Sequence, residues 1–220
     1  MGLAGKKIVV KEFKSPNNRL AEHVVIMYLW GEYGLEADGL LDLFFKSSPP
    51  ELAAHMLEFI GRDTWREKKP NPKIRDRMKD LWDWRLRCVG GPANMPKQEL
   101  AAFGWWFAGA QFDTGWAFEQ LEQVLKRTPI EHCTVQVFER MNEVFPDYPH
   151  QTLRCLRLFA DVSDDPWLFR VAQKEKGAWS LLEQAIKTGD AAIREEAEDI
   201  IHLLGSKGYL EYRELLGRTG

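Results

Sequence analysis

The sequence has few of the residues from which catalytic and metal sites are built. Its three cysteines, Cys88, Cys133 and Cys155, form no CxxC pair, and no two of its five histidines lie three or four residues apart. It contains no GxxxxGK[ST] loop, no GxGxxG turn and no GxSxG elbow. These absences predict a protein that is not an enzyme and that uses no cofactor and no metal, with buried thiols typical of a reducing compartment.

Long hydrophobic runs and an excess of one charge are also missing. The longest apolar run, at 24–30, is too short to cross a bilayer, and charged residues flank the apolar residues 8–10, unlike a signal peptide. We therefore expect no membrane association and a cytoplasmic location. The net charge of −3 excludes a globally basic nucleic-acid binder but leaves room for a local basic patch.

What the sequence does contain is a repeated helical pattern. The segment LEQVLK at 121–126 and the segment LEQAIK at 182–187 are each followed by a turn and by a second amphipathic helix. Such hairpins bury their apolar faces by stacking on neighbouring hairpins. No stretch shows sustained β-type alternation. The sequence therefore predicts an all-α protein of about twelve helices, stacked as the hairpins of an α-solenoid.

The expected helices are separated by short breaks rich in Pro, Gly, Asn and Asp. They lie at 15–33, 37–46, 50–62, 73–89, 96–107, 114–127, 130–145, 149–160, around 166, 178–188, 190–204 and 209–216. Residues 1–14 are expected to form an extended segment or linker. Residues 15–220 are expected to form a single helical repeat domain, with a sub-boundary near 64–72, where the chain is charged and proline-rich.

Aromatic residues are concentrated between 103 and 118. Two interpretations of this cluster stay open: a packed joint in the core, or an aromatic surface that anchors a partner. Adjacent residues on a helix diverge by about 100°, so one of two neighbouring Trp side chains can be core while the other faces a groove. The candidate partner-binding residues are Trp105, Trp106, Phe112 and Trp116.

A second candidate surface is basic. Ten basic and five acidic residues lie between 62 and 87, a local net charge of +5, and three Trp residues are interleaved with them. One interpretation is a grip on a phosphate backbone. The other is a solvated helix face with ion pairs between residues three or four positions apart. The residues that would contact phosphates are Lys69, Lys73, Arg77 and Arg87.

Two parts of the sequence resemble a known class. The segments FGWWFA at 103–108, FD at 112–113, WA at 116–117 and GSKGYLEYR at 205–213 resemble HEAT-like helical repeats. These repeats form C-terminal parts of large, mostly uncharacterised bacterial proteins, some associated with phage defence. The resemblance covers about 103–216 and, more loosely, 37–62. It implies a scaffold or sensor that binds a protein partner on a concave face, and it transfers no catalytic residue.

HEAT-like alkylpurine DNA glycosylases also use paired Trp residues, with a nearby carboxylate. Here Trp105 and Trp106 are followed by Phe107, and the next acid is Asp113. That family therefore serves only as the model for the alternative function, a nucleic-acid-binding helical repeat that uses the segment 62–87.

Overall fold

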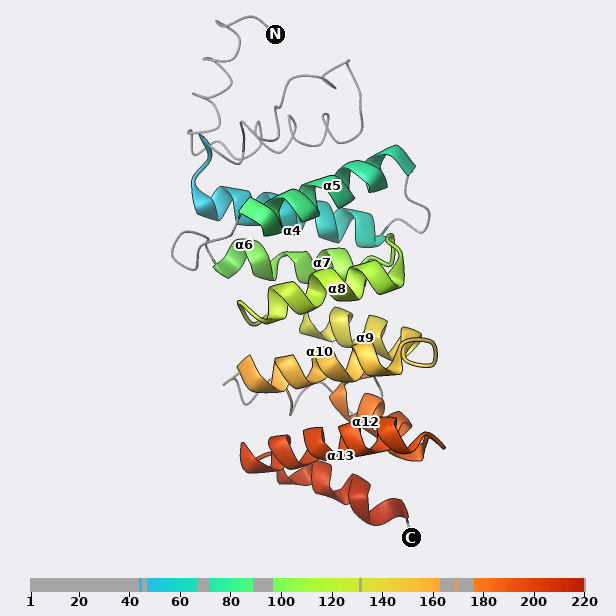
Figure 1. Ribbon diagram of the computed structural model, residues 1–220. Coiled ribbons are helices and arrows are strands. Elements are labelled where there is room, and N and C mark those ends of the chain that lie inside the picture. Colours follow the sequence, from blue (N-terminus) through green and yellow to red (C-terminus); the bar gives the residue numbers. More distant parts are fainter. Residues whose placement is uncertain are drawn as a thin grey trace, which may run out of the picture. The chain divides into compact units, whose positions relative to one another are not determined.

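The computed structural model describes residues 44, 47–66, 72–88, 97–130, 132–162, 169 and 176–219, and these residues are all-helical. They contain nine α-helices, one 3-10 helix and no strand (Figure 1). The elements are α4 (Pro50–Arg66), α5 (Pro72–Cys88), α6 (Lys97–Ala101), α7 (Phe103–Ala108), α8 (Thr114–Leu125), α9 (Thr134–Val144), α10 (Pro149–Val162), α12 (Ala178–Lys187), α13 (Ala191–Ser206) and η2 (Leu210–Thr219).

The all-α prediction is confirmed for this part of the chain, in which nine α-helices are described instead of about twelve. The helix expected at 15–33, the extended segment 1–14 and most of the helix at 37–46 lie outside the described residues. The chain forms two compact units, Met1–Gln111 and Phe112–Gly220. The expected sub-boundary near 64–72 overlaps the end of α4, which continues to Arg66. A single repeat domain over 15–220 stays a prediction.

Two expected helices differ in detail from the structure. The helix expected at 96–107 is divided into α6 and α7 at Ala102, whose carbonyl accepts from the Trp105 N–H at 3.2 Å, the three-residue spacing of a 3-10 turn. The helix expected at 209–216 is the 3-10 helix η2, in which the Tyr212 N–H bonds to the Tyr209 carbonyl. The helical periodicity in the sequence does not distinguish these tighter turns from an α-helix.

Local chemistry fixes several helix ends. The Asp113 carboxylate accepts from the Trp116 N–H at 2.9 Å and caps α8, and Asp190 caps α13 in the same way. After α13, the Tyr209 N–H bonds to the Leu204 carbonyl and the Gly208 N–H to the Gly205 carbonyl. This is a Schellman motif, which needs the left-handed φ of +96° that Gly208 supplies.

The first unit is built around α7, whose six residues are all buried. Helix α7 contacts α4 and α6. The Trp106 indole N–H donates to the Leu57 carbonyl of α4 at 2.7 Å. Gly61 allows this close approach, because a Cβ there would lie 2.6 Å from Trp106 Cδ1 and 2.7 Å from Trp105 Cβ. A helix buried all round explains why α7 carries almost only aromatic and small residues.

Helix α5 contributes one aromatic side chain to the ring cluster of this core. Trp82 is fully buried and stacks on Phe103 with ring centroids 5.1 Å apart, and its ring meets Trp106 edge-on at 6.0 Å. Phe103 and Trp106 are also edge-on to each other at 5.1 Å. Three rings from two helices therefore form one cluster in the arrangements that aromatic pairs favour.

The second unit is organised around α10, which contacts both α8 and α13 (Figure 1). His150 bonds to Glu196, and the Asp161 carbonyl accepts from Lys207, so residues of α10 lie opposite residues 46 positions later in the chain. Both contacts join residues that are 46 positions apart, so the two helices advance in the same direction and α10 and α13 run parallel. Phe118–Tyr148 and Glu122–Arg154 give offsets of 30 and 32, so α8 runs parallel to them as well.

Helices α9 and α12 contact each other beside this parallel set. Asn142 of α9 donates through Nδ2 to the Lys176 carbonyl at 3.0 Å, just before α12, and Gln184 of α12 donates to Asn142 Oδ1 at 3.0 Å. The two LEQ segments lie on α8 and α12, and these two helices contact different neighbouring helices. Their sequence similarity does not correspond to equivalent positions within the unit.

The 3-10 helix η2 is held to the second unit by Tyr212. This side chain is 1% exposed, its ring centroid lies 5.6 Å from that of Trp179, and its hydroxyl donates to the Phe169 carbonyl at 2.9 Å. Burial raises the pKa of the Tyr212 phenol, and the charge of Glu211 raises it further. The phenol therefore stays protonated in the folded chain well above the pH at which an exposed tyrosine ionises.

We expect Gly61→Ala to destabilise the protein by about 1–3 kcal/mol, because the added methyl group must displace α7. This loss would appear although alanine favours a helix interior over glycine by about 1 kcal/mol. Urea unfolding followed by Trp fluorescence measures it. Gly189→Ala is the control, since a Cβ there meets no atom within 4 Å. Equal stability of the two variants would contradict the close packing of α4 and α7.

We expect the free energy of unfolding to fall as pH rises above about 10, the pKa of a tyrosine in an unfolded chain. The unfolded phenol of Tyr212 then loses its proton while the folded phenol keeps it, so base favours the unfolded state. Tyr212→Phe should be less stable at neutral pH by about 0.5–1.5 kcal/mol, and its stability should fall less steeply with pH. Parallel pH profiles for the two proteins would show that Tyr212 does not contribute.

Candidate functional site

Three of the four predicted partner-binding aromatics are buried. Trp106 is 1% exposed, Phe112 is 8% exposed and Trp105 is 9% exposed. The guanidinium of Arg62 covers the Trp105 ring at 5.5 Å. In the described structure these side chains belong to the core, in agreement with the first of the two interpretations of the cluster.

Trp116 differs from the other three candidates. It is half-buried near the start of α8, and its ring lies 5.2 Å from that of Phe112. Glu119, one turn further along the same side of α8, is exposed. Trp116 is therefore the one residue of the predicted set that offers part of its ring to solvent.

The basic segment 62–87 supplies α5 and the end of α4. Lys69 and the Lys73 side chain lie outside the described residues, and Arg77 is half-buried. Arg87 is exposed, but its Nε donates to the Asp83 carbonyl at 3.2 Å. Arg75 pairs with Asp76 at 3.3 Å. Of the described cations of this segment, Arg75 thus has an adjacent acidic partner and Arg87 a backbone carbonyl.

One ion pair of this region is buried, and the sequence analysis does not predict it. Arg85 of α5 binds the carboxylate of Glu99 on α6, with the side chains 12% and 2% exposed. The Arg85 guanidinium also lies over the Trp84 ring at 4.9 Å. Burial raises the pKa of Glu99, while the charge of Arg85 and its hydrogen bond act in the opposite direction. No local pattern predicts such a pair, because its partners are 14 residues apart.

The parallel helices α8, α10 and α13 each have exposed polar residues on one side. We call this surface the three-helix face. Along α10 the exposed residues recur every three or four positions, which places them on one side of the helix. The members of the face are Trp116, Glu119 and Gln123 from α8 with its C-cap residue Lys126, His150, Arg154, Arg157 and Asp161 from α10, and Glu195, Asp199, His202 and Ser206 from α13.

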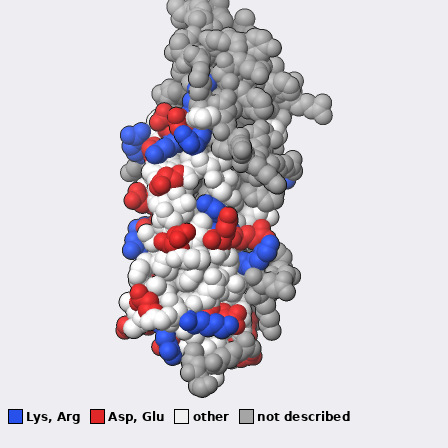
Figure 2. All heavy atoms as spheres, turned by 90° about the vertical axis from the view of Figure 1, so that its right-hand side faces the viewer, with Lys and Arg blue, Asp and Glu red and all other residues white. Residues whose placement is uncertain are grey.

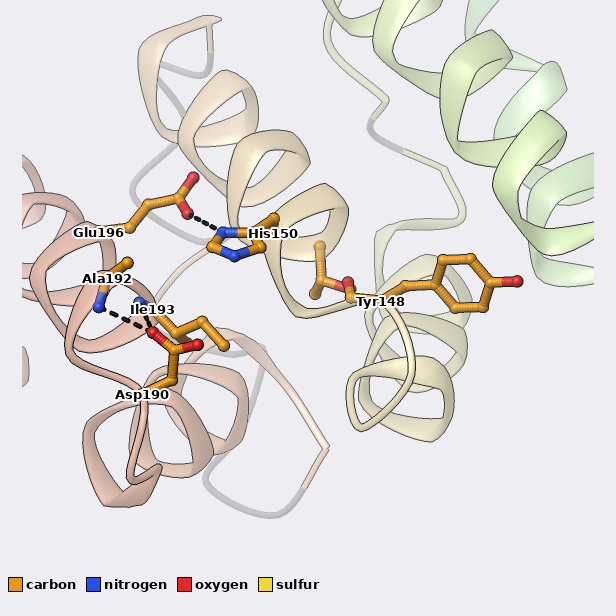
Figure 3. A network of polar contacts seen from close by, with 7 residues as sticks. Tyr148, His150, Asp190, Ala192, Ile193 and Glu196 are labelled. Carbon is orange, nitrogen blue, oxygen red and sulfur yellow. Dashed lines mark hydrogen bonds and ion pairs between the residues drawn. The ribbon is translucent and has the colours of Figure 1, made fainter.

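A polar contact joins α10 and α13, two of the helices of the three-helix face. His150 Nδ1 of α10 lies 3.1 Å from Glu196 Oε2 of α13. Figure 3 shows this ring pointing toward Glu196, next to the Asp190 cap of α13, while the Tyr148 ring points away from the pair. His150 is half exposed, so the contact is open to solvent and contributes little to stability.

Charges of both signs are interspersed on the surface. On the side drawn in Figure 2, acidic and basic side chains of the described part lie next to one another. In the ranges that the structure describes, no three His, Cys, Asp or Glu side chains are grouped so that they could hold a metal ion. None of the described helices is both long enough and apolar enough to cross a membrane.

No protein family, no curated protein and no solved structure matches the chain. The resemblance to HEAT-like repeats therefore stays a prediction that rests on the residues quoted for it.

We expect Glu99→Ala to destabilise the first unit by about 3–5 kcal/mol, because it leaves the Arg85 guanidinium buried without a counter-charge. The double variant Arg85→Met/Glu99→Leu should recover most of this loss, since apolar side chains of similar volume have no desolvation penalty. Urea unfolding of the single and double variants measures both effects. A double variant as unstable as Glu99→Ala would show that packing, and not charge, dominates at this site.

Proposed function

We propose that the chain is a non-enzymatic scaffold that binds a protein partner, built as an α-solenoid of stacked helical hairpins. The observation that carries this proposal is the parallel arrangement of α8, α10 and α13 in the second unit. Parallel helices joined by returning helices are what stacked hairpins produce, and in a solenoid such helices line an extended binding surface. HEAT-like character and a place in a larger bacterial, defence-type system are part of the same proposal.

The partner is proposed to bind on the three-helix face, which would be the concave side of the solenoid. Trp116 lies on α8 together with the exposed Glu119 and Lys126. Aromatic side chains that are partly exposed among polar neighbours are frequent anchors of protein interfaces. Trp105, Trp106 and Phe112 are buried and are not themselves proposed as contacts.

The groups with raised pKa values lie in separate places, which supports a function other than catalysis. Catalytic groups with perturbed pKa values converge on one cleft. Here Glu99 is on α6 and pairs with Arg85, whereas Tyr212 is on η2 and bonds to a backbone carbonyl. Cys155 is buried on α10, and burial raises the pKa of its thiol, which leaves it unreactive. Each group lies in a different element and has a structural explanation.

Binding of nucleic acid through the basic segment 62–87 remains the alternative. The Arg75–Asp76 pair within α5 and the buried Arg85–Glu99 pair reduce the charge that this segment can offer to phosphates. A cytoplasmic location, expected from the cysteines, is compatible with either function.

Co-purification from native lysate, with and without nuclease, tests the proposal. We expect a protein partner to be retained after nuclease treatment and to be lost with Trp116→Ala. The melting temperature of this variant should fall by no more than about 4 °C, because the ring is only half-buried. Trp106→Ala is the comparison, and it should lower stability by about 3–5 kcal/mol.

Partners that disappear after nuclease treatment would shift the function to the basic segment. If Trp116→Ala captured as much of the partner as the unaltered protein does, the partner would not contact this end of α8.

A further inference from the structure

We propose that the partner binds through an acidic protein segment, and that a basic stripe made of Lys126, Arg154 and Arg157 receives it. This proposal rests on the scaffold function and names its binding site and the chemistry of its partner. The stripe lies within the second unit, on the α8 and α10 parts of the three-helix face.

Two of the three cations come from one helix. Arg154 and Arg157 are both exposed on α10 at a spacing of three residues, which places them on the same side, about one turn apart. Lys126 comes from α8, which runs parallel to α10. Glu122 joins the two helices, since its carboxylate lies 3.3 Å from Lys126 Nζ and 3.7 Å from Arg154 Nη1.

The stripe has more positive charge than its neighbours neutralise. Among the residues that the structure describes, Glu122 supplies the carboxylate that pairs with the stripe, and its side chain is 20% exposed. Lys126 and Arg154 are 57% and 58% exposed, so their charged ends extend beyond this carboxylate into solvent. Arg157 is exposed and forms no ion pair with any residue that the structure describes. Lys126 and Arg154 thus share the single carboxylate of Glu122, and Arg157 adds a third positive charge.

The borders of the stripe indicate the class of partner. Along α10 the stripe is followed by Asp161, and along α8 it is preceded by Glu119. On α13, beside α10, the exposed residues include Glu195 and Asp199. A nucleic-acid strand, with a negative charge at every phosphate, would meet these acids on leaving the stripe. A short protein segment can place a few carboxylates on the three cations and neutral or basic side chains on the border.

The experiment measures binding of two anionic probes to the full chain by fluorescence anisotropy at low salt. The probes are a short labelled poly-glutamate peptide and a labelled single-stranded DNA oligonucleotide of similar charge. We expect the peptide to bind more tightly than the DNA. Arg154→Glu/Arg157→Glu should weaken peptide binding by about tenfold or more, and Arg154→Gln/Arg157→Gln by a smaller factor. Melting temperatures confirm that both variants fold.

The matched control is Lys187→Glu/Arg194→Glu. These two cations are also exposed, and each pairs with a glutamate four residues away, so their reversal creates a similar local repulsion outside the stripe. We expect the control to bind the peptide like the unaltered protein. Equal weakening by the control and the stripe variants, or tighter binding of DNA than of peptide, would overturn the proposal.

Co-purification from nuclease-treated lysate distinguishes failure of this proposal from failure of the scaffold function. Loss of the captured partner in the Arg154→Glu/Arg157→Glu variant, with retention in the control, supports the stripe. A partner retained by both variants contradicts the stripe while the scaffold function stands. Failure of the unaltered protein to capture any partner contradicts the scaffold function itself.

Discussion

Each amphipathic helix of this chain has an apolar stripe that only neighbouring helices can cover, and this constraint organises both units. Helix α10 covers its stripe against α8 and α13, which leaves its opposite side, with Arg154 and Arg157, in solvent. Helix α7 has no polar side and is buried all round. The same requirement therefore produces a core element in one unit and an exposed polar face in the other.

Close packing in the first unit depends on a few small or polar atoms. Gly61 leaves the space that the Trp105 and Trp106 side chains fill, and the Leu57 carbonyl accepts the Trp106 indole N–H. The buried Glu99 carboxylate has its counter-charge in Arg85. Such groups are costly to bury without partners, so their pairing restricts how α4, α5, α6 and α7 can be arranged.

In the second unit the same parallel arrangement that buries the core also brings charges together. Glu122 holds Lys126 and Arg154 beside each other although they belong to different helices, and Arg157 extends the stripe by about one turn. The acids at Asp161, Glu195 and Asp199 limit its extent. Under the proposed scaffold function, this pattern of charges would select the partner.

The sequence by itself determined the helical class and the position of most helices, because periodicity is a local property. The exposed positions of Arg154 and Arg157 on α10 could also have been found from helical spacing. Only the tertiary structure decided that Trp105 and Trp106 are both buried, that Arg85 pairs with Glu99, and that Lys126 joins the stripe. These facts depend on which helices become neighbours, and the local sequence of a helix does not specify its neighbours. The two LEQ segments illustrate this, since similar local sequences lie on α8 and α12 and make different contacts.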